Sequence, residues 1–241
     1  MEFPIQAIVL NTIKYGESSV ILHAYTQDFG LRSFVVKGVR SAKRNKSFTM
    51  GMFQPLTQLE LVASTPNRSG LSVLKSAKIT PPYTSIPLDI SKSSVCLFLA
   101  EVLRSALKEE EQNHALYSFL SNALAWIDTH DHTANAHILI LIQLTKYLGF
   151  YPDVSNMVYP YFDLQNGHFC PHAHSNDCVS GNEILLFKTF LGTKFDTLET
   201  ILASADQRRG LLELLMRYYQ LHLQSFGIPK SLAVLYEVFN V

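Results

Sequence analysis

Apolar residues in the first 80 positions fall into short runs that alternate with polar residues or are rich in β-branched side chains. Gly16-Glu17-Ser18 and Asp28-Phe29-Gly30 interrupt these runs with turn residues. The pattern is typical of strands joined by tight turns. The runs cover residues 5–13, 20–26, 31–39, 53–62 and 71–79. Five short strands separated by turns predict a small closed or nearly closed barrel.

The period of the pattern changes after Pro81-Pro82, which we take as the domain boundary. Apolar residues then recur every three or four positions, the spacing of amphipathic helices. Helices are expected over residues 95–107, 116–127, 138–148, 184–191 and 211–226. Residues 150–181 show neither period and contain several prolines and glycines. They indicate an irregular insert between helices.

The sequence therefore predicts an α+β fold. A five-stranded OB-fold β-barrel is expected over residues 1–80, followed by an all-helical C-terminal domain over residues 81–241 with the irregular insert at 150–181. The OB-fold is a five-stranded barrel well known for binding single-stranded nucleic acid. We therefore expect residues 1–80 to be the nucleic-acid-binding domain.

The composition argues against a disordered, membrane-spanning, secreted or disulfide-rich protein. Hydrophobic residues make up 47% of the 241 positions and charged residues 17%, so the chain can bury a sizeable core. It has no apolar run of transmembrane length and no secretory signal pattern, so we expect a cytoplasmic protein without a membrane partner. Cys96, Cys170 and Cys178 are too few for a disulfide framework.

The net charge is zero, but the charge is unevenly distributed. Residues 1–80 contain ten Lys and Arg against four Asp and Glu, a net charge of +6, and the remainder carries −6. Six cations lie within fifteen residues that contain no acid, and we predict that they bind nucleic-acid phosphates. They are Arg32, Lys37, Arg40, Lys43, Arg44 and Lys46. A merely solvated basic face is the plainer interpretation.

Aromatic residues near these cations are candidates for stacking on unpaired bases. The nearby phenylalanines are Phe29, Phe34, Phe48 and Phe53. Phenylalanines in strands more often belong to the core, and this interpretation is favoured for each of them.

A second candidate site lies in the insert, where Cys170, His172, His174 and Cys178 fall within nine residues. These are zinc-ligand types, but structural zinc sites usually pair their ligands as C-x2–4-C with a second pair some distance away. The crowded spacing favours a loop of unligated side chains, so we expect no metal and no other cofactor.

The chain is not expected to be an enzyme. It contains no P-loop, no His-Glu-x-x-His and no Gly-x-Ser-x-Gly motif. His130-Asp131-His132 lies between two helical patterns and is interpreted as a polar connection rather than a catalytic pair.

Several short strings, in this order along the whole chain, resemble one known family, the RecO DNA-repair proteins. Those of the barrel are Ala7-Ile8-Val9-Leu10, Tyr15-Gly16-Glu17-Ser18, Thr26 with Gly30, Val36-Lys37-Gly38-Val39-Arg40 and Gln54-Pro55-Leu56. Leu148-Gly149-Phe150-Tyr151-Pro152-Asp153, Phe162-Asp163 and Gly167 resemble the family's insert, and Lys230-Ser231-Leu232 its C-terminal signature.

The chain departs from the family pattern in two places. Ser19 stands where the family often has an acidic residue. Many members also carry two Cys-x-x-Cys pairs that hold zinc in the insert, but no cysteine occurs here between Cys96 and Cys170. Cys170 matches one member of the second pair, and His172, His174 and Cys178 are the residues nearby that could replace the other. The resemblance therefore implies the insert but not its metal.

The resemblance implies a mediator of DNA repair and homologous recombination in the bacterial cytoplasm, associated with the nucleoid. Such a protein binds single-stranded and double-stranded DNA and anneals complementary strands. With RecR it helps load RecA onto single-stranded DNA covered by single-strand-binding protein. The alternative is a protein-interaction scaffold, in which the barrel binds a protein rather than DNA.

Overall fold

The structure is a computed structural model that describes residues 4–41, 48–64, 71–108 and 111–239. The chain forms two compact units, Met1–Thr129 and His130–Val241. Among the described residues, no helix has both the length and the apolar character needed to cross a membrane.

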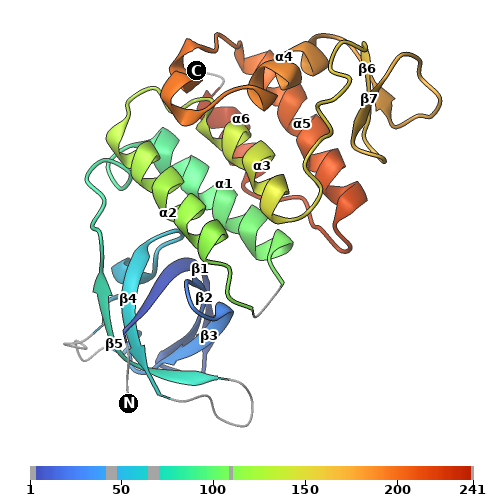
Figure 1. The fold of residues 1–241 in the computed structure, drawn as a ribbon. Coiled ribbons are helices and arrows are strands. Elements are labelled where there is room, and N and C mark those ends of the chain that lie inside the picture. Colours follow the sequence, from blue (N-terminus) through green and yellow to red (C-terminus); the bar gives the residue numbers. More distant parts are fainter. Residues whose placement is uncertain (1–3, 42–47, 65–70, 109–110, 240–241) are drawn as a thin grey trace. The chain divides into compact units, whose positions relative to one another are not determined.

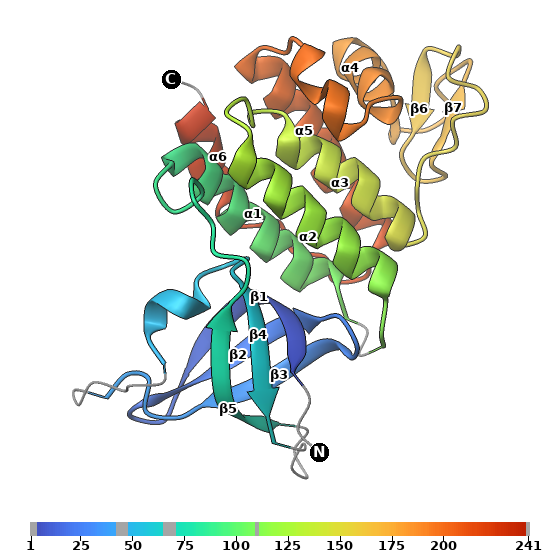
Figure 2. The same ribbon diagram turned by 60° about the vertical axis from the view of Figure 1, so that its left-hand side comes forward.

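The first unit begins with a closed barrel of five strands in the order β1-β2-β3-β5-β4 (Figure 2). Neighbouring strands are antiparallel except β3 and β5, which run parallel. The strands are β1 (Ile5–Tyr15), β2 (Ser19–Thr26), β3 (Gly30–Val36), β4 (Gln58–Ala63) and β5 (Ser72–Ile79). The OB-like barrel predicted from the alternation of apolar residues is confirmed.

Two predicted strands are shorter than their apolar runs. The run at residues 31–39 forms a strand only as far as Val36, and residues 37–40 form the turn that follows. The run at residues 53–62 forms a strand only from Gln58, and its beginning belongs to the 3-10 turn η1 (Met50–Phe53) and a connecting segment. Leu56 interrupts it because this buried residue has a φ of 61°, outside the strand region. Its N–H donates instead to the Val9 carbonyl at 2.8 Å, which ties the connecting segment to β1.

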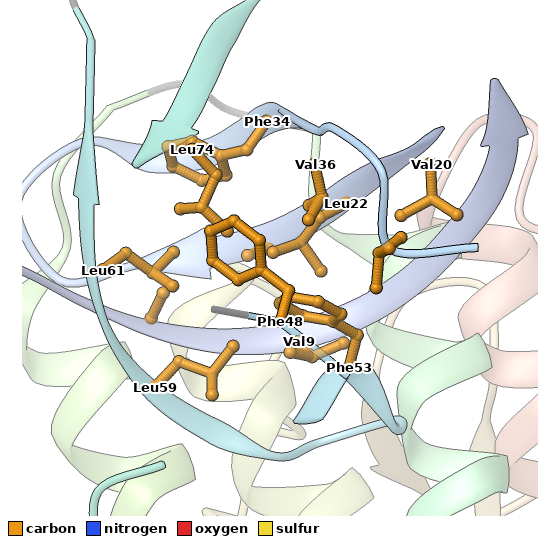
Figure 3. Close-up of a cluster of buried hydrophobic side chains, with 13 residues drawn as sticks. Val9, Val20, Leu22, Phe34, Val36, Phe48, Phe53, Leu59, Leu61 and Leu74 are labelled. Atoms are coloured by element: carbon orange, nitrogen blue, oxygen red, sulfur yellow. The ribbon is translucent and has the colours of Figure 1, made fainter. Parts of the chain in front are cut away.

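Side chains from all five strands and from the segment before β4 fill the barrel (Figure 3). Inward positions alternate along each strand, as Val20, Leu22 and Ala24 do on β2. Phe48 and Phe53 close the cluster, with ring centroids 6.1 Å apart. Burying each large apolar side chain contributes about 1.5–3 kcal/mol to the free energy of folding. The barrel strands therefore form a core of their own.

Two helices, α1 (Ile90–Ala106) and α2 (His114–Thr129), complete the first unit and lie side by side (Figures 1 and 2). Asp128 on α2 accepts hydrogen bonds from the backbone N–H groups of Thr84, Ser85 and Ile86, in the segment that leaves the barrel. Burial opposes ionisation of this carboxylate, but the three N–H groups outweigh it and lower its pKa to about 2. This carboxylate thereby fixes α2 to the segment that joins β5 to α1.

The predicted domain boundary at Pro81-Pro82 separates the barrel from the helices, whereas the compact units divide after Thr129. His130-Asp131-His132 lies in the connection between α2 and α3, as the sequence predicts.

The second unit consists of helices and a small sheet in the insert. Helices α3, α4 and α5 correspond to the three later helical patterns, whereas α6 was not predicted. The bounds are α3 (Ala136–Tyr147), α4 (Asn182–Leu191), η2 (Phe195–Thr200), α5 (Ala205–His222) and α6 (Leu232–Phe239). A full capping box starts α5, in which Ser204 and Gln207 satisfy each other's backbone N–H.

The insert is less irregular than its sequence suggests, because it contains a three-stranded sheet in the order β7-β6-β8. The strands are β6 (Tyr161–Asp163), β7 (His168–Cys170) and β8 (Cys178–Val179). Strands of two or three residues are too short to show a period of two. Figure 1 shows β6 and β7 beside α4 and α5.

Aromatic packing holds this sheet to the helices of the second unit. The Phe162 ring on β6 lies 5.1 Å from Phe187 on α4 and 5.7 Å from Tyr218 on α5, centroid to centroid. Tyr218 donates from its hydroxyl to the Phe150 carbonyl at 2.7 Å. At Gly167 the chain passes so close that a Cβ atom would lie 2.7 Å from the Tyr218 hydroxyl oxygen.

Candidate nucleic-acid interface

Three cations gather where the turn between β1 and β2 meets the end of β3, a region we call the hairpin end of the barrel. Lys14 is opposite Val20, and Val20 is opposite Val36, so Lys14 and the end of β3 share one row across three strands. Adjacent strands are about 4.8 Å apart, which places this row within about 10 Å. Lys37 follows directly, and both lysines are exposed.

Arg40 reaches the same hairpin end from the turn after β3. Its backbone N–H donates to the Ser18 carbonyl at 2.9 Å, and its guanidinium donates to the Gly16 carbonyl at 3.5 Å. A carbonyl oxygen carries no net charge, so this bond orients the guanidinium without neutralising it. Glu17, in the same turn, is exposed and contributes one negative charge to the hairpin end.

An exposed aromatic side chain accompanies these cations. Tyr15, the last residue of β1, is 49% exposed, and Ile13 is 50% exposed. A half-exposed tyrosine near cations has a flat surface of the kind on which an unpaired base can stack. The sequence analysis did not single out Tyr15. Its position between Lys14 and the turn glycine Gly16 is the signal that could have found it.

Arg32 does not belong to the hairpin end. It pairs with Ala24 near the opposite end of β3, and its guanidinium lies 6.0 Å from the centre of the Phe29 ring. At about 3.3 Å per residue, five positions along β3 separate Arg32 from Lys37 by roughly 17 Å. The structure thus brings Lys37 and Arg40 together and leaves Arg32 apart.

The other three predicted cations, Lys43, Arg44 and Lys46, lie outside the described residues. Before these residues the described chain ends at Ser41, whose N–H donates to the Gly38 carbonyl. The described chain resumes at Phe48 in the barrel core.

The favoured interpretation, that the phenylalanines belong to the core, is confirmed for three of the four. Phe34, Phe48 and Phe53 are between 2% and 7% exposed and belong to the barrel core. Each lies at an inward position, where a nucleic acid has no access. Phe29 differs, being 46% exposed at the turn before Arg32.

Two other lysines of the barrel lie on β5. Lys78 is opposite Glu60 on β4, so a carboxylate neighbours its amino group. Lys75 lies two residues beyond the last β3–β5 pair, Val35 and Val73. Continuing this parallel register brings Lys75 level with Lys37, on the side of the hairpin end.

Comparison with known proteins agrees with this architecture. Residues 1–83 match the family model "Recombination protein O N terminal", and residues 87–232 match "Recombination protein O C terminal". The chain belongs to the RecO family. It is 41% identical to the DNA repair protein RecO of Flavobacterium psychrophilum over the full length of both chains. Identity is also 41% to the protein of the same name from Christiangramia forsetii and 35% to that of Bacteroides fragilis, over 98% and 97% of each chain.

The insert of this RecO-family protein contains the four candidate metal ligands named from the sequence, and the structure brings three of them together. The Sγ atoms of Cys170 and Cys178 and one ring nitrogen of His174 all lie within 4.8 Å of one another. Among the described residues, His172 is not part of this group, although it is only two positions from His174.

A buried carboxylate fixes the histidine of this group. Asp163 is 1% exposed and lies 2.9 Å from His174 Nε2. Burial opposes ionisation of Asp163, but hydrogen bonds from Asn166 and its neighbours outweigh it and lower the pKa of the carboxyl. The hydrogen bond to Asp163 in turn raises the pKa of His174.

Proposed function

We propose that this RecO-family DNA repair protein binds single-stranded and double-stranded DNA through the hairpin end of its barrel. The observation that carries the proposal is the grouping of Lys14, Lys37 and Arg40 at the hairpin end of the barrel, where Tyr15 is half exposed. Cations at this spacing neutralise successive phosphates and release their counterions. The aromatic ring holds an unpaired base. Binding of this kind requires no bond to be made or broken by the protein.

The further steps follow from the same charge distribution. Annealing brings two polyanions together, and a cationic surface that holds both backbones lowers their repulsion. The remainder of the chain, with a net charge of −6, suits protein partners rather than DNA. We propose RecR and single-strand-binding protein as these partners, with RecA loading onto single-stranded DNA as the outcome.

The contribution of the hairpin end is tested by titrating a fluorescent single strand at several salt concentrations. The double variant Lys37→Gln, Arg40→Gln should weaken binding about tenfold and reduce the salt slope by roughly 1.4, two single-strand phosphate contacts. A matched control is Lys194→Gln, Arg209→Gln, which removes one lysine and one arginine from exposed positions of the second unit. If both variants bind alike at every salt concentration, the hairpin end does not bind DNA.

The role of Tyr15 is tested by comparing single-stranded with duplex DNA. Stacking contributes about 1–3 kcal/mol per base, so Tyr15→Ser should weaken single-strand binding at least fivefold and leave duplex binding nearly unchanged. Tyr15→Phe retains the ring and should bind like the original protein. Equal losses for both kinds of DNA would show that Tyr15 does not distinguish unpaired bases.

A further inference from the structure

We propose that a cavity between α3, α5 and α6 of the second unit binds one small inorganic anion of the size of chloride. The cavity is lined by His137 from α3, by Arg208 and Leu212 from α5, and by Tyr236 and Phe239 from α6, among others. These helices carry none of the proposed DNA contacts, so the inference does not depend on DNA binding.

Two hydrogen-bond donors at this cavity lack an acceptor. Arg208 Nε and the Tyr236 hydroxyl oxygen are buried, and neither forms a hydrogen bond within the part of the chain that the structure describes. Both residues line the cavity. A buried donor without an acceptor is costly, and the cost is larger when the donor is charged. One acceptor held in the cavity can satisfy both donors.

The charges around the cavity favour an anion over a water molecule as this acceptor. Arg208 donates from Nη1 to the Ala203 carbonyl at 2.6 Å, but within the described ranges no carboxylate pairs with it. Burial lowers the pKa of its guanidinium. Arg209 also lines the cavity, and it is already paired with Glu213 at 3.2 Å. A partly desolvated cation without a counterion is stabilised by a negative charge beside it.

The size of the cavity limits which anion can bind. Its volume is about 20 Å³, which is room for one or two water-sized groups. His137, only 2% exposed, forms part of the wall, with its ring stacked 5.8 Å from that of Phe239. A monatomic anion fits this space. A nucleotide, a peptide segment or a tetrahedral ion such as sulfate is too large to enter it whole.

A bound anion has a structural role here, because it joins α6 to α5. α6 has eight residues, and Leu235 is the one residue of this helix that is fully buried. A helix of this length is not stable by itself and depends on its contacts with other elements. The guanidinium of Arg209 already lies 4.7 Å from the centre of the Tyr236 ring. An ion between Arg208 and Tyr236 adds a second connection between the same two helices.

The experiment measures chloride binding to the full chain near neutral pH by the line width of the chloride nuclear magnetic resonance signal. Gluconate, a bulky anion, keeps the ionic strength constant. The original protein should broaden the signal, and bromide but not sulfate should reverse the broadening. Arg208→Gln should lose this bromide-sensitive broadening. Tyr236→Phe removes only the hydroxyl group and should weaken chloride binding about tenfold, the effect of one hydrogen bond to a charged group.

Arg217→Gln is the matched control. It removes an arginine from the same helix, at an exposed position paired with Asp177 and outside the cavity. It should broaden the chloride signal as the original protein does. Thermal unfolding followed by circular dichroism gives a second measurement. Chloride in place of gluconate should raise the unfolding temperature of the original protein and of Arg217→Gln, but not that of Arg208→Gln. Sulfate stabilises proteins by exclusion from their surface and should act alike on all three.

Equal broadening in Arg208→Gln and Arg217→Gln overturns the anion site. If Arg208→Gln does not fold, Tyr236→Phe decides, because loss of one hydroxyl group leaves the packing of the ring intact. Chloride binding that is unchanged in Tyr236→Phe also overturns the site, and it would mean that water is the acceptor for these donors.

Discussion

The barrel and the insert of this protein are both antiparallel for the most part, but they are stabilised differently. The barrel strands are six to eleven residues long and enclose their own cluster of apolar side chains. The insert strands have two or three residues, and Phe162 finds its partners on α4 and α5. A strand that presents one or two residues to each face cannot form a core by itself, so it depends on neighbouring elements.

The same contrast applies to the two candidate sites. Arg32 and Lys37 are five residues apart, and an extended strand places them at opposite ends of the barrel. Cys170 and Cys178 are eight residues apart, and a crossing segment brings them together. Residues close in sequence therefore lie far apart when they are on one extended strand. They lie close together when the chain between them turns back.

The largest expected effect tests whether the insert depends on the helices. Gly167→Ala forces a Cβ against the Tyr218 hydroxyl at 2.7 Å, in a backbone with φ of 68° that disfavours alanine. We expect a loss of about 3 kcal/mol, from left-handed strain and overpacking together. Urea unfolding followed by circular dichroism measures this loss.

Gly149→Ala is the control, because Gly149 also has a positive φ, of 83°, but open space around its Cβ position. It should lose only the strain, about 1 kcal/mol. Adding Tyr218→Phe to Gly167→Ala should recover part of the difference. Equal losses for the two alanine variants would mean that the close approach to α5 does not hold the insert.

A second prediction concerns how the stability of the second unit depends on pH. Burial and the nearby charge of Arg208 lower the pKa of His137, on α3, to about 3. Its pKa in the unfolded chain is near 6.5, so stability is retained above pH 6.5 and lost as the pH falls from there towards 3. Between pH 6.5 and pH 5 the loss should reach about 2 kcal/mol.

Calorimetry at pH 7 and pH 5 measures this loss, and His137→Leu, which cannot be protonated, should flatten it. The fluorescence of Trp126, on α2, follows the first unit, where burial and the nearby charge of Arg104 lower the pKa of His23 as well. The contrast is therefore the effect of His137→Leu, which should leave the pH dependence of the Trp126 signal unchanged. If His137→Leu leaves the pH dependence of stability unchanged, protonation of this imidazole does not cause the loss of stability at low pH.

The smallest expected effect concerns the separation of the cations on β3. Arg40→Gln should weaken binding of a short single strand roughly threefold and lower the salt slope by about 0.7, one phosphate contact. Arg32→Gln removes the same charge near the other end of the strand and should change neither. Equal effects in a salt titration would mean that the DNA follows the whole length of β3 rather than the hairpin end.

Much of the fold could be predicted from the sequence because it depends on local patterns. Alternating apolar residues gave five strands, and a spacing of three or four gave helices α1 to α5. The strands of the insert and the short helix α6 escaped prediction, since two to eight residues show too little of a period. Tyr15 escaped as well, because its place beside the turn glycine Gly16 signals the end of a strand, whereas the exposure of its ring follows only from the structure.

The sequence by itself determined the kinds of element, their order along the chain, the excess of positive charge in the first 80 residues and the membership of a family. Only the tertiary structure decided which residues lie at the same place. Lys14 and Arg40 lie at the hairpin end and Arg32 near the other end of β3, and His174 lies beside Cys178 with His172 outside that group. The reason is that composition and period are properties of a segment. The distance between two side chains also depends on strand order and on the path of the chain between them.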